Sequence, residues 1–181
     1  MYRGEVGADQ LNRALQERLN PKEQLGLPHA GRALRVGDKV MQIRNNYEKE
    51  VFNGDIGRVS GVDRVEQQAI VDFPGRGEVV YEIADLNELV TAYAITVHKS
   101  QGSEYRVIVL PLLTQHYVML QRNLLYTALT RARELVVIVG TKKALAIAIK
   151  NNRVTQRHSR LAQKLSQAAS HQDVPPYPSG Q

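Results

Sequence analysis

Residues 107–140 read VIVLPLLTQHYVMLQRNLLYTALTRARELVVIVG and hold two apolar runs on either side of a segment with helical periodicity. The runs cover Val107–Pro111 and Leu135–Val139, and residues 122–133 between them are predicted to form a helix. A second, short helix is expected at residues 144–149. Strands without polar positions that alternate with helices are typical of a parallel sheet that is covered on both faces. The pattern therefore predicts an α/β domain in this part of the chain.

The first residues predict a separate helix. Leucines at four-residue spacing indicate a helix that starts with Asp9 as its N-cap and continues to about Arg18. Pro21 cannot continue a helix and restricts the residue before it, so the helix is expected to end there. The next stretch, Gly26–Gly31, has the composition of a linker. The leucines expected on the buried face are Leu11, Leu15 and Leu19.

Between residues 34 and 88, short β-prone runs alternate with turn sequences. The turns are Asn53-Gly54-Asp55 and the Pro-Gly stretch at residues 74–77. Strands at this spacing predict a small antiparallel barrel, and a length of roughly 55 residues fits the SH3-like class. The expected strands are Lys39–Arg44, Ile56–Ser60, Gln68–Phe73 and Val79–Ile83.

The order of these parts predicts an α/β domain that is interrupted by a barrel. Residues 1–33 and 89–150 are assigned to the α/β domain, and residues 34–88 to the barrel inserted into it. Residues 151–181 are polar and basic, then rich in Pro, Ser and Gly. This last segment is expected to form a basic helix followed by a disordered end.

The composition excludes several classes of protein. The chain of 181 residues has no cysteine, which rules out a disulfide framework and a cysteine metal site. Its five histidines do not lie at metal-ligand spacing, so no metal site is assigned. No apolar run approaches the ~18–20 residues that are needed to cross a bilayer. A cytoplasmic protein without a membrane partner is therefore expected.

The charge is distributed unevenly along the chain. Residues 1–105 hold 13 Lys/Arg and 16 Asp/Glu, whereas residues 106–181 hold 11 Lys/Arg and 2 Asp/Glu. The basic second part indicates either a polyanionic partner or a solvated basic tail, because charge alone does not separate them. Its last basic residues, which could contact nucleic-acid phosphates or form a solvated helix face, are Lys142, Lys143, Lys150, Arg153, Arg157, Arg160 and Lys164.

One loop of the predicted barrel carries aromatic residues. Tyr47 and Phe52 follow Asn45-Asn46, and an exposed ring there could stack on a nucleic-acid base. A packed loop tip is the favoured alternative.

Residues 91–104 are rich in short hydrogen-bond donors. A helix is expected through His98–Gln101, and the stretch then reaches Gly102 and Glu104. Hydroxyl and N–H donors suit phosphate and sugar oxygens, and glycine lets the backbone approach a ligand closely. A carboxylate can accept a hydrogen bond from a ribose hydroxyl. The alternative is a polar helix cap and loop before the strand at Val107.

Residues 126–133 carry two arginines, Arg131 and Arg133, near the end of the predicted helix. Two positions apart on a helix, their side chains point in different directions, so one can reach a cleft while the other faces solvent. An arginine aimed at a γ-phosphate neutralises the charge that develops during phosphoryl transfer. The alternative is that both arginines pair with surface carboxylates.

Taken together, the two segments resemble motifs of a known enzyme family. Residues 94–104 resemble helicase motif V of the RecD-like (exodeoxyribonuclease V alpha subunit-like) family, and residues 125–133 resemble motif VI of superfamily 1 helicases. Val36–Met41, Asn53–Gly57 and the Leu-Asn…Leu-Gln…Asn-Pro pattern of residues 11–21 are similar to the same family. The resemblance implies the second RecA-like motor domain with an SH3-like insertion.

The resemblance covers about residues 1–148 and implies a role for each matching position. Arg131 matches the arginine finger on the γ-phosphate, and Glu104 matches the acid near the nucleotide ribose. Gly102 and Arg133 belong to the same nucleotide site, where Arg133 either touches the ligand or supports the motif. The positions that match the contact with the single-stranded DNA backbone are Thr96, His98, Lys99, Ser100 and Gln101.

The chain departs from this family in what it lacks. It contains no Gly-x-x-x-x-Gly-Lys-Ser/Thr loop and no adjacent Asp-Glu pair, so the Walker A phosphate cradle and the Walker B magnesium ligands are missing. The chain is therefore expected to be a C-terminal fragment of an ATP-dependent helicase, and to be inactive alone. ATP and Mg²⁺ would be bound mostly by a missing N-terminal RecA-like domain.

The family resemblance also implies partners and a direction of movement. Single-stranded DNA and subunits of a nuclease complex are the expected partners, and 5′ to 3′ movement is implied by the resemblance alone. The alternative function is a non-enzymatic module that binds nucleic acid or protein, because a barrel with a basic tail needs no nucleotide chemistry to do so.

Overall fold

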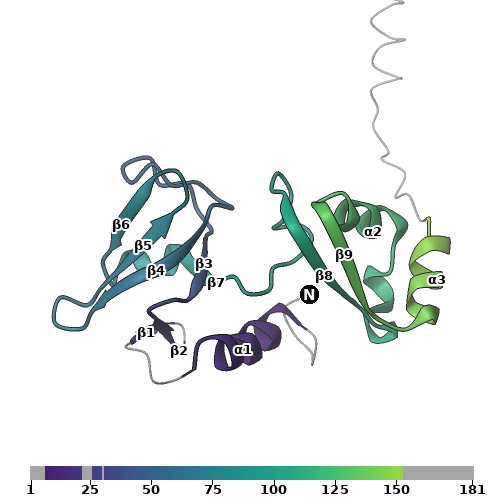
Figure 1. The fold of residues 1–181 in the computed structure, drawn as a ribbon, viewed down its shortest axis with the longest axis horizontal. Coiled ribbons are helices and arrows are strands. Elements are labelled where there is room, and N and C mark those ends of the chain that lie inside the picture. Colours follow the sequence, from purple (N-terminus) through teal and green to yellow (C-terminus); the bar gives the residue numbers. More distant parts are fainter. Residues whose placement is uncertain (1–6, 22–25, 30, 153–181) are drawn as a thin grey trace, which may run out of the picture. The chain divides into compact units, whose positions relative to one another are not determined.

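A computed structural model describes residues 7–21, 26–29 and 31–152 of the chain (Figure 1). The predicted basic helix of the tail falls almost wholly on residues 153–181, which lie outside the described residues. In the described part, no helix is long and apolar enough to cross a membrane.

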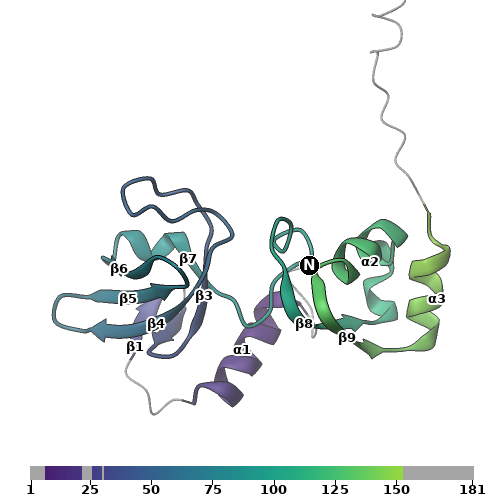
Figure 2. The ribbon, with the colours of Figure 1, turned by 45° about the horizontal axis from the view of Figure 1, so that its top comes forward.

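Five antiparallel strands form the larger sheet, in the order β6-β5-β4-β3-β7 (Figures 1 and 2). Strands β3 to β6 confirm the four predicted strands, although β3 ends two residues earlier, β4 ends three residues later and β6 lies two residues earlier than expected. Strand β7 was not predicted. The 3-10 helix η1 (Asp85–Glu88) leads into the edge strand β7. The strands are β3 (Lys39–Gln42), β4 (Ile56–Asp63), β5 (Gln68–Phe73), β6 (Gly77–Tyr81) and β7 (Leu89–Thr91).

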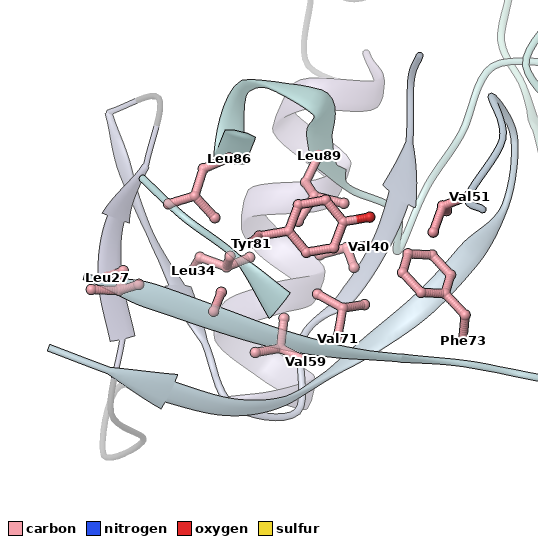
Figure 3. Close-up of a cluster of buried hydrophobic side chains, with 11 residues drawn as sticks. Leu27, Leu34, Val40, Val51, Val59, Val71, Phe73, Tyr81, Leu86 and Leu89 are labelled. Carbon is pink, nitrogen blue, oxygen red and sulfur yellow. The ribbon is translucent and has the colours of Figure 1, made fainter. Parts of the chain in front are cut away.

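Alternating side chains of these strands build an apolar core (Figure 3). Val59 of β4 and Val71 of β5 are neighbours in register and are both buried, as the period of two along a strand requires. Tyr81 is also buried, and its hydroxyl donates to the Gln42 Oε1 atom at 2.9 Å. Gly57 lets β4 and β5 approach closely, because an added Cβ would lie 2.6 Å from a Val71 methyl carbon.

The predicted linker at Gly26–Gly31 is wrong. The strands β1 (Gly26–His29) and β2 (Arg32–Arg35) form an antiparallel hairpin instead. Leu27 and Leu34 face one another in register and are buried in the core of the larger sheet. The two leucines thus bury enough apolar surface to hold a segment whose Gly and Pro content indicated a loop.

The helix α1 (Ala8–Leu19) confirms the predicted helix and its end before Asn20-Pro21, but not its buried face or its cap. The N-cap is Gly7, which has no side chain to accept a hydrogen bond from the first turn. Asp9, the expected N-cap, lies inside that turn. Leu19 is 67% exposed, which contradicts the expected leucine face. The buried residues are Ala8, Asn12, Gln16 and Asn20.

The predicted parallel α/β unit is confirmed by strands β8 (Tyr105–Leu112) and β9 (Ala132–Gly140), which pair in parallel. The 3-10 helix η2 (Thr114–Met119) follows β8. Helices α2 (Arg122–Leu129) and α3 (Lys142–Lys150) lie beside the two strands (Figures 1 and 2) and share a core with Leu110 and Leu112 of β8. Thr141 caps α3, because its hydroxyl accepts a hydrogen bond from the Ala144 N–H at 3.1 Å.

Two expectations for this unit are wrong. The strands are not covered on both faces by the described residues, since Val109 is 63% exposed and Val139 is 54% exposed. The helix expected over residues 122–133 ends at Leu129, with Thr130 as its C-cap. Ala132 already belongs to β9, because the β-branched run that follows favours an extended chain over another helical turn.

Candidate functional site

The two segments predicted to carry chemistry meet at one end of the β8–β9 pair. Tyr105 and Ala132 are paired in register, and the Tyr105 N–H donates to the Arg131 carbonyl oxygen at 2.8 Å. Parallel strands begin at the same edge of a sheet, so the residues that enter β8 lie beside those that enter β9. The structure therefore brings Ser103 and Glu104 next to Arg131 and Arg133.

Arg131 lies in the turn between α2 and β9, not on a helix as expected. Its Nη1 atom donates to the Ser103 carbonyl oxygen at 3.5 Å, which is a long contact. Its Nε atom is buried and has no hydrogen-bond partner in the described part of the chain. None of the ion pairs among the described residues includes Arg131. A buried N–H without an acceptor is unfavourable, so this guanidinium is suited to receive an oxygen ligand.

Arg133 behaves differently from Arg131. Its Nε atom donates to the Glu104 Oε2 atom at 2.7 Å, and both side chains are more than half exposed. An exposed pair of this kind contributes little to stability. Pairing with a surface carboxylate, the alternative given for both arginines, is therefore seen among the described residues for Arg133 but not for Arg131.

Residues 97–102 form consecutive turns, so the helix expected through His98–Gln101 is wrong. The Ser100 N–H donates to the Thr96 carbonyl oxygen at 3.1 Å, and the Ser100 hydroxyl donates to the Val97 carbonyl oxygen at 2.7 Å. Gly102 then adopts a φ of +84°, a left-handed conformation that ends any helix. No described atom lies within 4 Å of a Cβ placed at residue 102, so a side chain would have room. The left-handed backbone conformation, and not crowding, therefore favours glycine at this position.

The turn exposes some of its predicted ligand-binding side chains and buries another. His98, Gln101 and Gly102 are exposed, whereas Thr96 and Lys99 are half-buried. Ser100 is buried, and its hydroxyl is already used within the turn. Among the predicted DNA-binding residues, the exposed His98 and Gln101 are thus best placed to touch a ligand.

The start of this segment is held by residues that were not predicted to take part in the site. Asn12 of α1 donates from Nδ2 to the Ala94 carbonyl oxygen at 2.8 Å and accepts from the Ala94 N–H at 2.9 Å. The Tyr93 hydroxyl donates to the Asp38 Oδ1 atom at 2.9 Å. The spacing of Asn12, Gln16 and Asn20 on one helix face was a signal for these contacts, but the leucines beside them obscured it.

Asp38 is the centre of this buried polar cluster. Its Oδ2 atom accepts from the Gln16 Nε2 atom at 2.6 Å and from the Arg35 N–H at 2.9 Å. Its Oδ1 atom accepts from the Asn20 Nδ2 atom at 2.7 Å as well as from Tyr93. Four donors therefore satisfy a carboxylate that is fully buried, which is the condition under which burial of such a group is tolerated.

The pKa of Tyr93 predicts a loss of stability at alkaline pH. Burial, followed by the hydrogen bond to Asp38, raises this pKa from 10.0 to about 12. The unfolded chain therefore releases the proton first, so the stabilisation is complete below about pH 10 and is lost as pH rises towards 12. Denaturant unfolding measured between these limits is expected to show the decline, and Tyr93→Phe is expected to reduce it.

The matched control for this prediction is Tyr47→Phe, because the Tyr47 ring is 77% exposed. A Tyr93→Phe variant with the same alkaline decline as the unmodified chain would contradict the assignment.

The aromatic loop and the described basic residues, which were also candidates for nucleic-acid contact, make ordinary surface contacts or are exposed. Phe52 packs edge-on against Tyr47 with ring centroids 6.0 Å apart, and the Arg76 guanidinium lies 4.8 Å from the Phe52 centroid. The three lysines of α3 are exposed, and the remaining basic residues of the predicted stretch lie outside the described residues. No group of three His, Asp or Glu side chains that could hold a metal ion occurs in residues 7–21, 26–29 and 31–152.

Two family models match the chain. Residues 11–73 match the SH3 domain of ATP-dependent RecD-like DNA helicases, and residues 91–139 match the UvrD-like helicase C-terminal domain. The first match includes most of α1 and strands β1 to β5, and the second includes the converging segments at the start of β8 and β9.

Curated relatives are similar over most of this chain. The ATP-dependent RecD2 DNA helicase of Deinococcus radiodurans is 41% identical over 155 residues, which cover 84% of this chain and 21% of that protein. The RecBCD enzyme subunit RecD of Mycolicibacterium smegmatis is 32% identical over 152 residues, which cover 84% of this chain and 26% of that protein. The chain thus spans about a quarter of the length of these relatives.

A solved structure has a similar fold. It is a crystal structure of Pif1 helicase from Bacteroides in complex with ADP-AlF3 and ssDNA, and it is 18% identical with a TM-score of 0.55. The match covers 89% of this chain and 43% of that chain.

Proposed function

Because the chain belongs to the RecD-like family of superfamily 1 DNA helicases, we propose that it supplies one half of the ATPase site and part of the DNA track of such a motor. In this proposal, β8, β9, α2 and α3 belong to the second RecA-like domain. The SH3-like insertion expected at residues 34–88 extends in both directions, because the hairpin β1–β2 shares its core and the edge strand β7 (Leu89–Thr91) pairs with β3. The remaining half, with the Walker A and Walker B motifs, lies on a different RecA-like domain of the intact protein.

The observation that carries the proposal is the environment of Arg131. Among the described residues, its buried Nε has no acceptor and no carboxylate pairs with it, although Glu104 lies nearby on the same edge. A planar guanidinium of this kind can donate two parallel hydrogen bonds to phosphate oxygens. We assign Arg131 the role of arginine finger, which stabilises the negative charge that develops on a γ-phosphate.

The other residues at this edge fit the sugar and base side of a nucleotide. Glu104 can accept from a ribose hydroxyl, Arg133 holds its carboxylate at 2.7 Å, and Gly102 keeps the backbone accessible. Bound ATP supplies the phosphoanhydride bond whose hydrolysis drives the motor. The described residues offer no cluster of acids for Mg²⁺, so its ligands are assigned to the other RecA-like domain.

The turn at residues 97–102 is assigned to single-stranded DNA. His98 and Gln101 are exposed and can donate to phosphate or sugar oxygens, and Thr96 and Lys99 border them. Ser100 takes a supporting role in this assignment, because its hydroxyl holds the turn closed. Movement from 5′ to 3′ and assembly with nuclease subunits are further parts of the proposal that come from the family resemblance.

The test measures how an ATP analogue changes the affinity of the intact protein for a fluorescent single-stranded oligonucleotide. The analogue is expected to change the Kd of the unmodified protein about fivefold or more, which is a typical coupling between two sites. Gln101→Ala is expected to raise the Kd for DNA by about tenfold, as for the loss of one charge-assisted contact. Gln115→Ala, at an exposed glutamine of η2, is the control and is expected to bind normally.

Two results together would contradict the motor role. If the analogue left the DNA affinity unchanged and Gln101→Ala bound like the unmodified protein, a non-enzymatic binding module would be the better description.

A further inference from the structure

The chain that leads into the DNA-binding turn is anchored along its length by the SH3-like sheet and α1. Strand β7 pairs with β3, and the Ala92 N–H then continues the ladder by donating to the Lys39 carbonyl oxygen at 2.8 Å. Tyr93 is tied to Asp38, and Ala94 is tied to Asn12. The anchored stretch ends at Ala94, shortly before the turn at residues 97–102 begins.

Asn12 makes the last of these contacts, and its geometry is unusually restrictive. One carboxamide bonds both the N–H and the carbonyl of Ala94, at 2.9 Å and 2.8 Å, as a neighbouring β-strand would. Asn12 is only 5% exposed, so it cannot itself touch DNA, and its buried amide is favourable only while both bonds are made. The side chain thus fixes the peptide planes on either side of Ala94.

We propose that Asn12 is a positioning residue for single-stranded DNA binding, acting through Ala94 on the turn that carries His98 and Gln101. This inference rests on the proposed function of that turn. Fixing Ala94 sets the direction in which the following residues leave the sheet. A DNA-binding turn with a fixed start loses less conformational entropy when it closes on a flexible strand.

A purely structural role for Asn12 makes a different prediction from a positioning role. Loss of a buried hydrogen-bonding side chain would lower the stability of the fold in either case. Only a positioning role changes the concentration of DNA that the motor needs while leaving the turnover at saturating DNA intact. The separation of KM from kcat therefore distinguishes the two.

The experiment measures DNA-stimulated ATP hydrolysis by the intact protein across a range of oligo(dT) concentrations. Asn12→Ala is expected to raise the KM for DNA by about tenfold, the size of effect that one or two lost buried hydrogen bonds produce. Its kcat at saturating DNA is expected to stay within about twofold of the unmodified value. Asn12→Asp keeps the size of the side chain but turns a carboxylate towards the Ala94 carbonyl oxygen, so it should behave like Asn12→Ala.

Two control variants separate this effect from a general loss of stability. Arg13→Ala changes the next, exposed residue of α1 and is expected to leave the KM unchanged. Val59→Ala removes core volume from the SH3-like sheet, so it is expected to lower the melting temperature without raising the KM for DNA.

Amide hydrogen exchange on the 181-residue chain provides the second readout, independent of ATP. Exchange at Ala94, whose N–H loses its acceptor, and along residues 96–101 is expected to accelerate in Asn12→Ala but not in Arg13→Ala. If exchange accelerated while the KM for DNA stayed unchanged, the positioning role would be wrong although the turn still binds DNA. If the unmodified intact protein showed no stimulation by DNA, the proposed function would itself be wrong, and this inference with it.

Discussion

Replacing Arg131 with alanine in the intact protein is expected to lower the kcat for ATP hydrolysis by roughly 10³-fold or more, the range known for arginine fingers. The physical reason is that the half-buried Arg131 side chain has no carboxylate partner in the described chain and its Nε atom has no acceptor there, so its charge is available to a phosphate. Arg131→Lys should restore little of the rate, because an ammonium group cannot form two parallel hydrogen bonds. The measurement is steady-state ATP turnover at saturating single-stranded DNA.

Arg106→Ala is the matched control for Arg131→Ala. Arg106 lies on β8 and pairs with Glu134 of β9, but both side chains are exposed. Its replacement is expected to leave turnover near the unmodified value, because such a surface pair contributes little. If Arg131→Ala hydrolysed ATP at a near-normal rate while its DNA binding fell, the arginine-finger role would be wrong.

Asp38→Asn is expected to destabilise the fold by about 2–4 kcal/mol, a large effect for a change that keeps the side-chain volume. The carboxylate accepts four hydrogen bonds, from Gln16 of α1, from the C-cap Asn20, from the Arg35 N–H and from Tyr93. An amide in its place turns an N–H group towards two of those donors, which leaves them unpaired. Urea unfolding of the variant and of the unmodified chain measures the difference.

Asp72→Asn provides the comparison for Asp38→Asn. Asp72 lies on β5 and is exposed, so its replacement is expected to change the free energy of unfolding by less than about 0.5 kcal/mol. Equal stabilities for Asp38→Asn and Asp72→Asn would show that the buried cluster contributes nothing through its charge.

Four of the five strands of the SH3-like sheet, β3 to β6, were predictable from their β-prone residues and the turn sequences between them, whereas β7 was not predicted. In β4 and β5 buried residues recur at alternate positions, as one buried face requires, and β5 (Gln68–Phe73) has the predicted bounds. The hairpin β1–β2 was missed for the opposite reason. Only Leu27 and Leu34 carry its apolar signal, and the surrounding Gly and Pro residues outweigh two leucines in any local pattern.

The buried face of α1 could not follow from hydrophobic periodicity. Specific hydrogen-bond acceptors explain why the amides of this face are buried. The Ala94 carbonyl oxygen accepts from Asn12, and the Asp38 carboxylate accepts from Gln16 and Asn20. Those acceptors are distant in sequence, so their positions are a property of the tertiary fold. The competing leucines favoured the wrong face.

The residues of the candidate site were predicted from the resemblance to family motifs, whereas the secondary structure predicted around them was partly wrong. The resemblance identified Glu104 and Arg131, which the structure places at the same edge of a parallel pair. It did not reveal that Arg131 lies in a turn, because the end of α2 is set by the β-branched strand that follows. Nor could it separate Ser100, whose hydroxyl holds the turn, from Gln101, which faces solvent.

The exposed apolar side chains of β8 and β9 affect how this chain behaves in solution at high concentration. Val109 and Val139 are more than half exposed, and in the described part of the chain each strand of the pair has one edge without a β partner. Apolar strands with open edges are templates for self-association, whose extent grows with protein concentration. Concentration is therefore a variable in any measurement on this chain by itself, and variants are comparable only at matched dilution.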